Sequence, residues 1–222
     1  MKEELVIHNK PKSNISEDIR TIRTNLMFTS SDEESQVILI TSSIPGEGKS
    51  FISSNLATAF AQTGESTLLI DSDLRLGRIH KVFGVSNDKG LSNLLIGQSV
   101  VDCAEFIKKT AIPNLYVIPR GTVPPNPSEL LNSSNTKKII SFLRENFDRI
   151  IFDGVPINGL PDSLIMASLV DRVVLVTSAG YTKIDELMEA KKALEKIDAN
   201  IAGVVVNRTN QTKRGKYSNY YE

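Results

Sequence analysis

The chain of 222 residues has one cysteine, two histidines and no tryptophan. The lone Cys103 excludes an internal disulfide and a zinc site built from several thiolates, and it is typical of a reducing compartment. We therefore predict a cytoplasmic location. With only His8 and His80 available, the sequence also argues against a histidine-based metal centre.

Neither sign of charge is in excess, because 26 Lys and Arg residues balance 26 Asp and Glu residues. The chain as a whole is therefore not expected to attract nucleic acid or an anionic membrane surface, and we predict no nucleic-acid partner. No apolar stretch approaches the roughly 20 residues that a membrane-spanning helix needs, and the N-terminus is acidic where a signal peptide would be basic. Membrane contact would then require a partner.

The most informative stretch is an apolar run that breaks into a glycine-rich turn ending in Lys49 and Ser50. Residues 37–40 suit a buried strand, and apolar residues recur at helical spacing after the turn. Between a strand and a helix, backbone N–H groups and the helix dipole favour an anion. We therefore predict a phosphate-binding loop, in which Lys49 reaches the β- and γ-phosphates and Ser50 binds Mg²⁺. The predicted nucleotide-binding residues here are Pro45, Gly46, Glu47, Gly48, Lys49, Ser50 and Phe51.

Aspartates follow two further apolar runs. Residues 67–71 lead to Asp71 and Asp73, and residues 149–153 end in Asp153. The carboxyl ends of strands are where α/β sheets bind ligands, and two neighbouring carboxylates repel unless a cation or a catalytic role compensates. We therefore predict a metal or catalytic site. An apolar run ending in aspartate also resembles a Walker B element, which serves Mg²⁺ if its strand lies beside the P-loop strand.

The N-terminal region has two predicted parts. Residues 1–14 lack periodicity and are expected to form a mobile lead-in, whereas residues 15–28 have an amphipathic pattern with Ser16 as the N-cap. Glu17, Arg20 and Arg23 form a charged stripe on this helix. The stripe is either a solvated face with pairing inside the helix or an oligomerisation surface.

The rest of the chain alternates helices with nearly all-apolar strands up to residue 207. This pattern predicts one α/β domain over residues 1–207, a doubly wound and mainly parallel sheet with helices on both faces. The pattern stops at residue 208, and residues 208–222 are expected to form a flexible basic tail. The tail contains Tyr217, Tyr220 and Tyr221.

In combination these motifs resemble those of the bacterial tyrosine kinases of capsular and exopolysaccharide loci, which share the fold of MinD/ParA-type P-loop ATPases. Residues 43–50, 69–75 and 150–153 are similar to the Walker A, Walker A′ and Walker B motifs of that family. The stripe on residues 17–23 resembles its oligomerisation motif, and residues 125–130 resemble its Pro-Asn-Pro-Ser-Glu segment. Residues 154–156 depart from the family, which usually has a small polar residue and two prolines there.

The resemblance implies ATP and Mg²⁺ as cofactors and assigns roles to residues. Lys49, Asp71 and Asp73 would be catalytic, with Asp71 as the base for a tyrosine hydroxyl. The implied metal ligands are Ser50, Asp73 and Asp153, the implied adenine contacts are Asn207 and Arg208, and the implied phosphoacceptors are Tyr217, Tyr220 and Tyr221.

The resemblance also implies a function and partners. The chain would phosphorylate its own tyrosine cluster in trans, act on other protein tyrosines and regulate polysaccharide synthesis and export. It would form a ring-like homo-oligomer, and the cytoplasmic tail of a transmembrane activator, a polysaccharide co-polymerase, would recruit it to the inner face of the membrane. The alternative is a nucleotide-switched assembly ATPase of the MinD/ParA type. The signature lysine of those ATPases would fall at Ile44, which favours the kinase.

Overall fold

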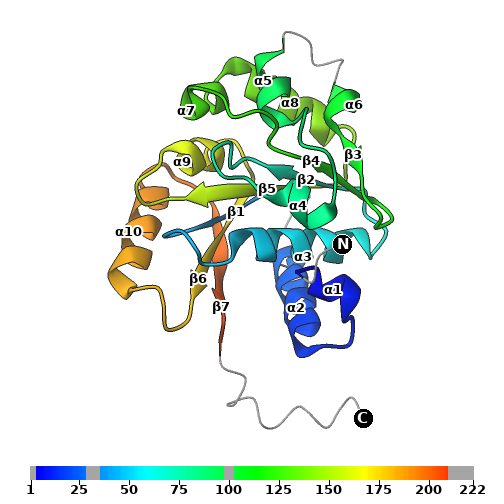
Figure 1. Ribbon diagram of the computed structural model, residues 1–222. Helices are drawn as coiled ribbons and strands as arrows, with labels where there is room; N and C mark the ends of the chain where they lie inside the picture. Colours follow the sequence, from blue (N-terminus) through cyan, green and yellow to red (C-terminus); the bar gives the residue numbers. More distant parts are fainter. Residues whose placement is uncertain (1–3, 29–35, 98–102, 210–222) are drawn as a thin grey trace.

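The computed structural model describes residues 4–28, 36–97 and 103–209. Within them, seven strands form one sheet in the order β3-β4-β2-β5-β1-β6-β7 (Figure 1). The strands are β1 (Val37–Ser42), β2 (Thr67–Asp71), β3 (Lys108–Lys109), β4 (Leu115–Ile118), β5 (Arg149–Pro156), β6 (Arg172–Ser178) and β7 (Ile201–Asn207). All neighbours pair in parallel except β3 and β4. The predicted mainly parallel α/β sheet is confirmed.

Helices cover both faces of this sheet (Figure 1). They are α1 (Val6–Asn9), α2 (Asn14–Phe28), α3 (Lys49–Ala61), α4 (Ile79–Phe83), α5 (Leu91–Ile96), α6 (Cys103–Phe106), α7 (Pro127–Leu131), α8 (Ser134–Arg144), α9 (Asp162–Ala167) and α10 (Ile184–Glu195). The first four contribute to the core on one face, and the other six contribute to the core on the opposite face. Side chains alternate along a strand, so Leu39 enters one core and Ile40 the other. This explains why the strands are apolar throughout.

Strand register brings the predicted motifs together. Strand β5 lies between β1 and β2, so Ile40 of β1 is level with Asp153, and Asp71 of β2 is also level with Asp153. Parallel strands present their carboxyl ends at one edge, and this edge carries the P-loop and both aspartates. The strand arrangement that a Walker B carboxylate requires is therefore present.

The N-terminal segment differs from the expected lead-in. Residues 6–9 form α1, and Leu5 and Ile7 are fully buried. Asn55 of α3 explains the order, because its side chain accepts the Ile7 N–H at 3.1 Å and donates to the Glu4 carbonyl at 2.8 Å. The two apolar side chains join the core under α3, so the segment from residue 4 onward is part of the domain.

Helix α2 begins earlier than the sequence predicted. Its first residue is Asn14, and Ser13 rather than Ser16 provides the cap, because the Ser13 hydroxyl accepts the Ser16 N–H at 3.2 Å. Ser16 itself is buried and donates to the Lys10 carbonyl. Across the part of the chain that the structure describes, no helix combines the length and apolar character of a membrane span.

Burial of the N-terminal segment makes a testable contribution to stability. Replacing Ile7 with Ala should lower the free energy of unfolding by about 2 to 5 kcal/mol, because it leaves a cavity beneath α3. Urea denaturation measures this change. The control is Lys10→Ala, an exposed side chain on the same segment, which should change stability by less than about 0.5 kcal/mol. Equal effects of the two substitutions would contradict the packing of this segment.

Candidate nucleotide-binding site

The predicted phosphate-binding loop connects β1 to α3. Gly46 and Gly48 adopt positive φ angles of 82° and 98°, and Gly48 caps the helix that starts at Lys49. A Cβ atom at Gly48 would lie 2.1 Å from the Asn207 amide nitrogen, so a larger residue would strain the backbone and displace the Asn207 side chain. The turn therefore places successive backbone N–H groups at a helix N-terminus, as an anion site requires.

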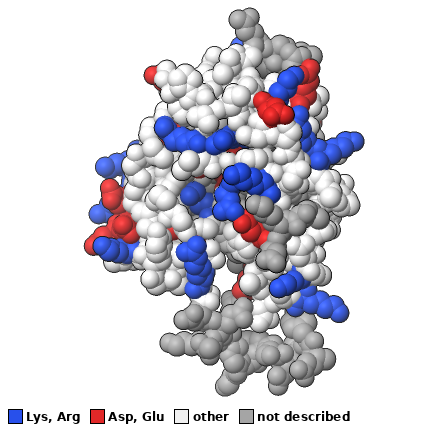
Figure 2. Space-filling model, viewed as in Figure 1, with Lys and Arg blue, Asp and Glu red and all other residues white. Residues whose placement is uncertain are grey.

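A cavity of about 740 Å³ opens at this loop. The P-loop contributes Pro45, Gly46, Gly48, Lys49, Ser50 and Phe51 to its lining, and residues 73 and 75–78 form another wall. Asn207 and Arg208 also line it, as does Glu4 from the N-terminal segment. Figure 2 shows Lys and Arg side chains gathered on the central part of the viewed face, with a few acidic side chains among them. The size and the basic lining suit a nucleotide polyphosphate.

The Glu47 side chain forms hydrogen bonds within the protein and does not line the cavity. It is fully buried; one carboxylate oxygen accepts the Ile44 N–H at 2.8 Å and the other accepts the Thr182 hydroxyl. The Tyr181 hydroxyl donates to the Pro45 carbonyl at 3.4 Å. The P-loop is thus fastened to the loop between β6 and α10, and Glu47 shapes the site through its side chain.

Asn207 and Arg208 lie at the cavity, at the end of β7. The Asn207 amide nitrogen donates to the Glu47 carbonyl at 2.9 Å, and its oxygen accepts the Arg208 N–H at 2.8 Å. The Asn207 side chain therefore already holds the P-loop in place. Arg208 has a left-handed backbone, with φ of 57°, and its guanidinium extends toward the Ser178 hydroxyl.

The three predicted aspartates occupy different depths. Asp73 lines the cavity, whereas Asp71 and Asp153 are buried behind it. Asp71 lies against Gly77, where an added Cβ would approach its carboxylate to 2.4 Å, and it accepts the Ile79 N–H at 3.0 Å. The structure therefore exposes one carboxylate of the predicted pair and covers the other.

Burial dominates the protonation of this cluster. It raises the pKa of Asp71 well above the usual aspartate range, and the nearby charge of Asp153 raises it further. Burial also raises the pKa of Asp153 to about 6, against the lowering effects of hydrogen bonds from Ser50 and Ser53 and of the Lys49 ammonium. The pKa of Lys49 is lowered by burial, which outweighs the attraction of Asp153 and Asp73. The site therefore holds buried acids that a cation would ionise.

The donor atoms fit Mg²⁺. One carboxylate oxygen of Asp71 and one of Asp153 are buried and have no hydrogen-bond partner among the described residues. Oxygen ligands of this type suit a hard cation. The described residues contain no group of three His, Cys, Asp or Glu side chains close enough to cage a metal. Mg²⁺ usually takes one or two carboxylates together with water and substrate phosphates, so such a cage is not required.

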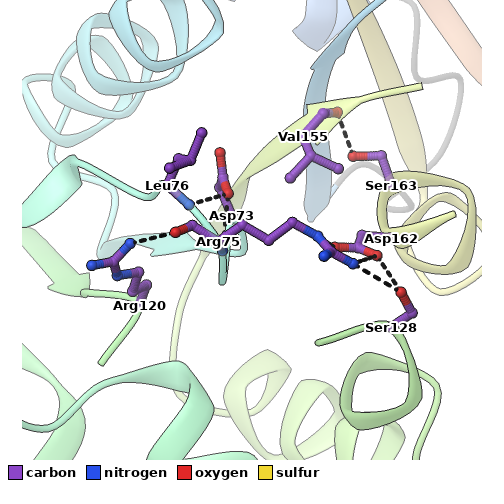
Figure 3. Close-up of polar contacts among 8 residues, drawn as sticks. All are labelled: Asp73, Arg75, Leu76, Arg120, Ser128, Val155, Asp162 and Ser163. Carbon is purple, nitrogen blue, oxygen red and sulfur yellow. Dashed lines mark hydrogen bonds and ion pairs between the residues drawn. The ribbon is translucent and has the colours of Figure 1, made fainter. Parts of the chain in front are cut away.

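A polar network at the cavity wall was not predicted from the sequence (Figure 3). Arg75 forms an ion pair with Asp162 of α9, at 2.9 Å, and also contacts the Ser128 hydroxyl. Asp162 is a single acid in the first turn of a helix, a position that normally indicates only a favourable interaction with the helix dipole. Its pairing with a residue 87 positions earlier leaves no mark in the local sequence.

The predicted oligomerisation stripe on α2 makes contacts within the chain. Glu17 pairs with Arg20, and the Arg23 guanidinium donates to the Ala59 carbonyl of α3 at 2.8 Å. Tyr217, Tyr220 and Tyr221 lie outside the described residues.

Comparison with known proteins identifies the family. Residues 35–205 match the model of an AAA domain. The chain is 40% identical to the putative tyrosine-protein kinase CapB of Staphylococcus aureus, over 98% of this chain and 94% of CapB. It is 37% identical to the tyrosine-protein kinase YwqD of Bacillus subtilis, over 99% of this chain and 92% of YwqD. The chain belongs to the bacterial tyrosine kinases.

Solved structures agree with this family and with the fold. The crystal structure of the chimerical protein CapA2B2 superposes on this kinase with a TM-score of 0.90, at 38% identity, and covers 95% of this chain and 92% of that one. The cell division ATPase MinD of Pyrococcus furiosus superposes with a TM-score of 0.68, at 28% identity, over 81% of this chain and 75% of MinD. The predicted MinD-type P-loop fold is therefore confirmed.

The raised pKa of Asp153 predicts that this carboxylate destabilises the nucleotide-free kinase. A native pKa of about 6 exceeds the usual 3.8, so the stabilisation present below pH 4 is lost as the pH rises through 6. Asp153→Asn, which mimics the protonated acid, should raise the unfolding free energy at pH 7.5 by about 1 to 3 kcal/mol and by little at pH 4. Urea denaturation at the two pH values measures this.

The control for this experiment is Asp198→Asn. Asp198 is exposed and has a positive φ of 53°, which Asn tolerates equally well. This variant should follow the pH dependence of the wild type. Lower stability of Asp153→Asn at pH 7.5 would contradict the proposed cost of burying the charge.

Proposed function

We propose that this kinase transfers the γ-phosphoryl group of ATP to tyrosines in its own C-terminal segment, in trans, and thereby regulates capsular or extracellular polysaccharide synthesis and export. The observation that carries the proposal is that Lys49 of the P-loop and Asp73 line one cavity, in a chain from this family, and that the charges of Asp153 and Asp73 both act on Lys49. The names of the relatives support tyrosine as the acceptor.

Each residue has a proposed role that its position supports. Backbone N–H groups of residues 46–50 and the Lys49 ammonium bind the phosphates, because they meet at the start of α3. Asn207 and Arg208 contact the adenine end of the cavity. Ser50, Asp73 and Asp153 hold Mg²⁺, directly or through water, and the bound ion neutralises charge that develops on the transferring phosphate.

The reaction needs positioning and a proton acceptor. The γ-phosphorus to bridging-oxygen bond breaks, a bond to the tyrosine oxygen forms, ADP leaves, and a carboxylate takes the hydroxyl proton. The raised pKa of Asp71 suits it to accept a proton, whereas its cover by Gly77 separates it from the cavity. Asp73 is directly accessible. We propose Asp71 as the base and Asp73 as the metal ligand, and the reverse assignment is the alternative.

Partners are proposed from the surface and from the relatives. The exposed side chains Met27 and Phe28 on α2, at 48% and 83%, leave apolar area beside the stripe of Glu17, Arg20 and Arg23. This supports a ring-like homo-oligomer in which α2 contacts a neighbouring subunit. The likeness to the chimerical CapA2B2 supports a further partner, which we propose to be the cytoplasmic tail of a transmembrane activator that recruits the kinase to the membrane.

The competing function is a nucleotide-switched assembly ATPase, which the likeness to MinD favours. Such ATPases would carry a second P-loop lysine at position 44, where this chain has Ile44. The two functions differ in the fate of the γ-phosphate. A kinase leaves radiolabel on protein, whereas an assembly ATPase releases it only as free phosphate.

A mixing experiment tests transfer in trans. Lys49→Met should not phosphorylate itself, because the substitution removes the charge that neutralises the β- and γ-phosphates. The triple variant Tyr217→Phe, Tyr220→Phe and Tyr221→Phe should bind ATP normally and incorporate almost no label, because it lacks the acceptor hydroxyls. When the two variants are mixed with labelled ATP and Mg²⁺, mass spectrometry should find phosphate on the tail of the Lys49→Met protein.

Four results would contradict this proposal. Label on the folded Lys49→Met protein alone would disprove the P-loop assignment. Absence of label in the mixture, while wild type labels itself, would place the transfer within one chain. Label mainly on Tyr116 or Tyr181 would show that the tail is not the acceptor. Free phosphate without labelled wild-type protein would favour the assembly ATPase.

The oligomerisation proposal has its own test. Replacing Glu17, Arg20 and Arg23 together with Ala should lower the mass measured by light scattering at matched concentration, because charge complementarity across a subunit boundary would be lost. The control is Lys191→Ala with Glu195→Ala, which removes an exposed i,i+4 ion pair on α10. An unchanged mass in the first variant would assign the stripe to contacts within the chain.

A further inference from the structure

Arg75 is held at both its side chain and its backbone (Figure 3). The guanidinium donates to the two carboxylate oxygens of Asp162, at 2.9 and 3.2 Å, and to the Ser128 hydroxyl at 3.3 Å. Ser128 in turn donates to Asp162 at 2.5 Å. The Arg75 carbonyl accepts from the Arg120 guanidinium at 2.8 Å. Groups from α7, α9 and the segment after β4 thus fix one residue of the cavity wall.

The pair is set into a rigid support. The Asp162 side chain is 1% exposed, and the Arg75 side chain is 36% exposed at the cavity. Ser163, the next residue of α9, donates to the Val155 carbonyl of β5 at 2.6 Å, which fastens the start of the helix to the sheet. An ion pair with one buried partner is weak evidence for stabilisation, because desolvation of the buried charge offsets much of the attraction. Stabilisation of the fold therefore does not explain why this ion pair lies at the cavity wall.

Asp73 is the residue whose geometry depends on Arg75. One Asp73 carboxylate oxygen accepts the N–H groups of Arg75, at 3.1 Å, and of Leu76, at 2.8 Å, while the Asp73 carbonyl accepts the Gly77 N–H at 2.8 Å. The direction of the Asp73 carboxylate is therefore fixed by the conformation of residues 75–77. Any movement of the Arg75 backbone would turn that carboxylate.

We propose that Asp162 and Ser128 are positioning residues which, through Arg75, orient Asp73 toward nucleotide-bound Mg²⁺. This inference rests on the proposed metal role of Asp73. Groups that orient a metal ligand commonly change metal affinity by about 10- to 100-fold when they are removed, although they never touch the ion. Asp162→Asn keeps the size of the side chain and removes the charge that holds the guanidinium.

The chain provides a matched control at the other end of the sheet. Arg144 binds both carboxylate oxygens of Asp171, at 2.8 and 2.5 Å, and Asp171 also accepts the Val37 N–H where β1 starts. Its side chain is 18% exposed. Asp171→Asn therefore breaks a bidentate, largely buried ion pair of the same kind, at the sheet edge opposite the cavity.

The test measures Mg²⁺-dependent binding of a fluorescent ADP analogue to the full chain, without any phosphoryl transfer. Asp162→Asn should raise the Mg²⁺ concentration at half-saturation by about tenfold, with unchanged analogue binding in EDTA. Ser128→Ala should shift it in the same direction by a smaller factor. Asp171→Asn should lower the melting temperature of the ligand-free protein and leave the Mg²⁺ requirement at the wild-type value.

The possible results separate the positioning role from the proposed metal site. A wild-type Mg²⁺ requirement in Asp162→Asn, or an equal shift in Asp171→Asn, overturns the positioning role. If Asp162→Asn does not fold, Ser128→Ala decides: a shift supports the role and no shift overturns it. If Mg²⁺ does not affect analogue binding to wild type, the proposed metal site itself fails, and this result is distinct from failure of the positioning role alone.

Discussion

The arrangement of the site depends on one electrostatic constraint, the burial of two carboxylates beside a single ammonium. Asp71 and Asp153 are level on neighbouring strands, and Lys49 begins the helix that follows the strand on the other side of Asp153. Ionised carboxylates in such a place are costly unless a cation joins them. Burial therefore favours partial protonation of this pair, and Mg²⁺ bound at the proposed site would supply the missing positive charge. Ligand binding and ionisation of this cluster are then one linked process.

A second constraint fixes the phosphate-binding loop. Thr182 and Asn207 reach it from the loop after β6 and from the end of β7, through the side chain and the carbonyl of Glu47. These contacts preorganise the turn before any ligand arrives, which lowers the entropic cost of binding. They also explain why Glu47 is fully buried although it lies in a loop at a cavity.

The sequence predicted those features that depend on local pattern. Apolar runs gave the parallel strands, and Gly46, Gly48 and Lys49 marked the turn whose backbone angles need glycine. What it could not predict depends on contacts between distant residues. The N-terminal segment buries two apolar residues, Leu5 and Ile7, which are too few to show helical periodicity. The residue that holds this segment in place, Asn55, lies about fifty positions later. Asp162 similarly has no local signal for its pairing with Arg75. The sequence also could not show how deeply each aspartate is buried. Asp71 and Asp73 are two residues apart, and of the two only Asp73 lines the cavity.

The contact between Asn207 and the P-loop has a consequence for local unfolding. Strand β7 is at the edge of the sheet and pairs only with β6 among the described strands, so its amide hydrogens belong to a part of the fold that opens at relatively low free energy. Opening would withdraw the Asn207 side chain from Glu47 and release the proposed phosphate-binding loop. Because coupling between sites is reciprocal, a nucleotide that binds the fastened loop must slow hydrogen exchange along β7. Hydrogen exchange along β7 would therefore report whether the cavity is occupied, although most residues of β7 do not line it.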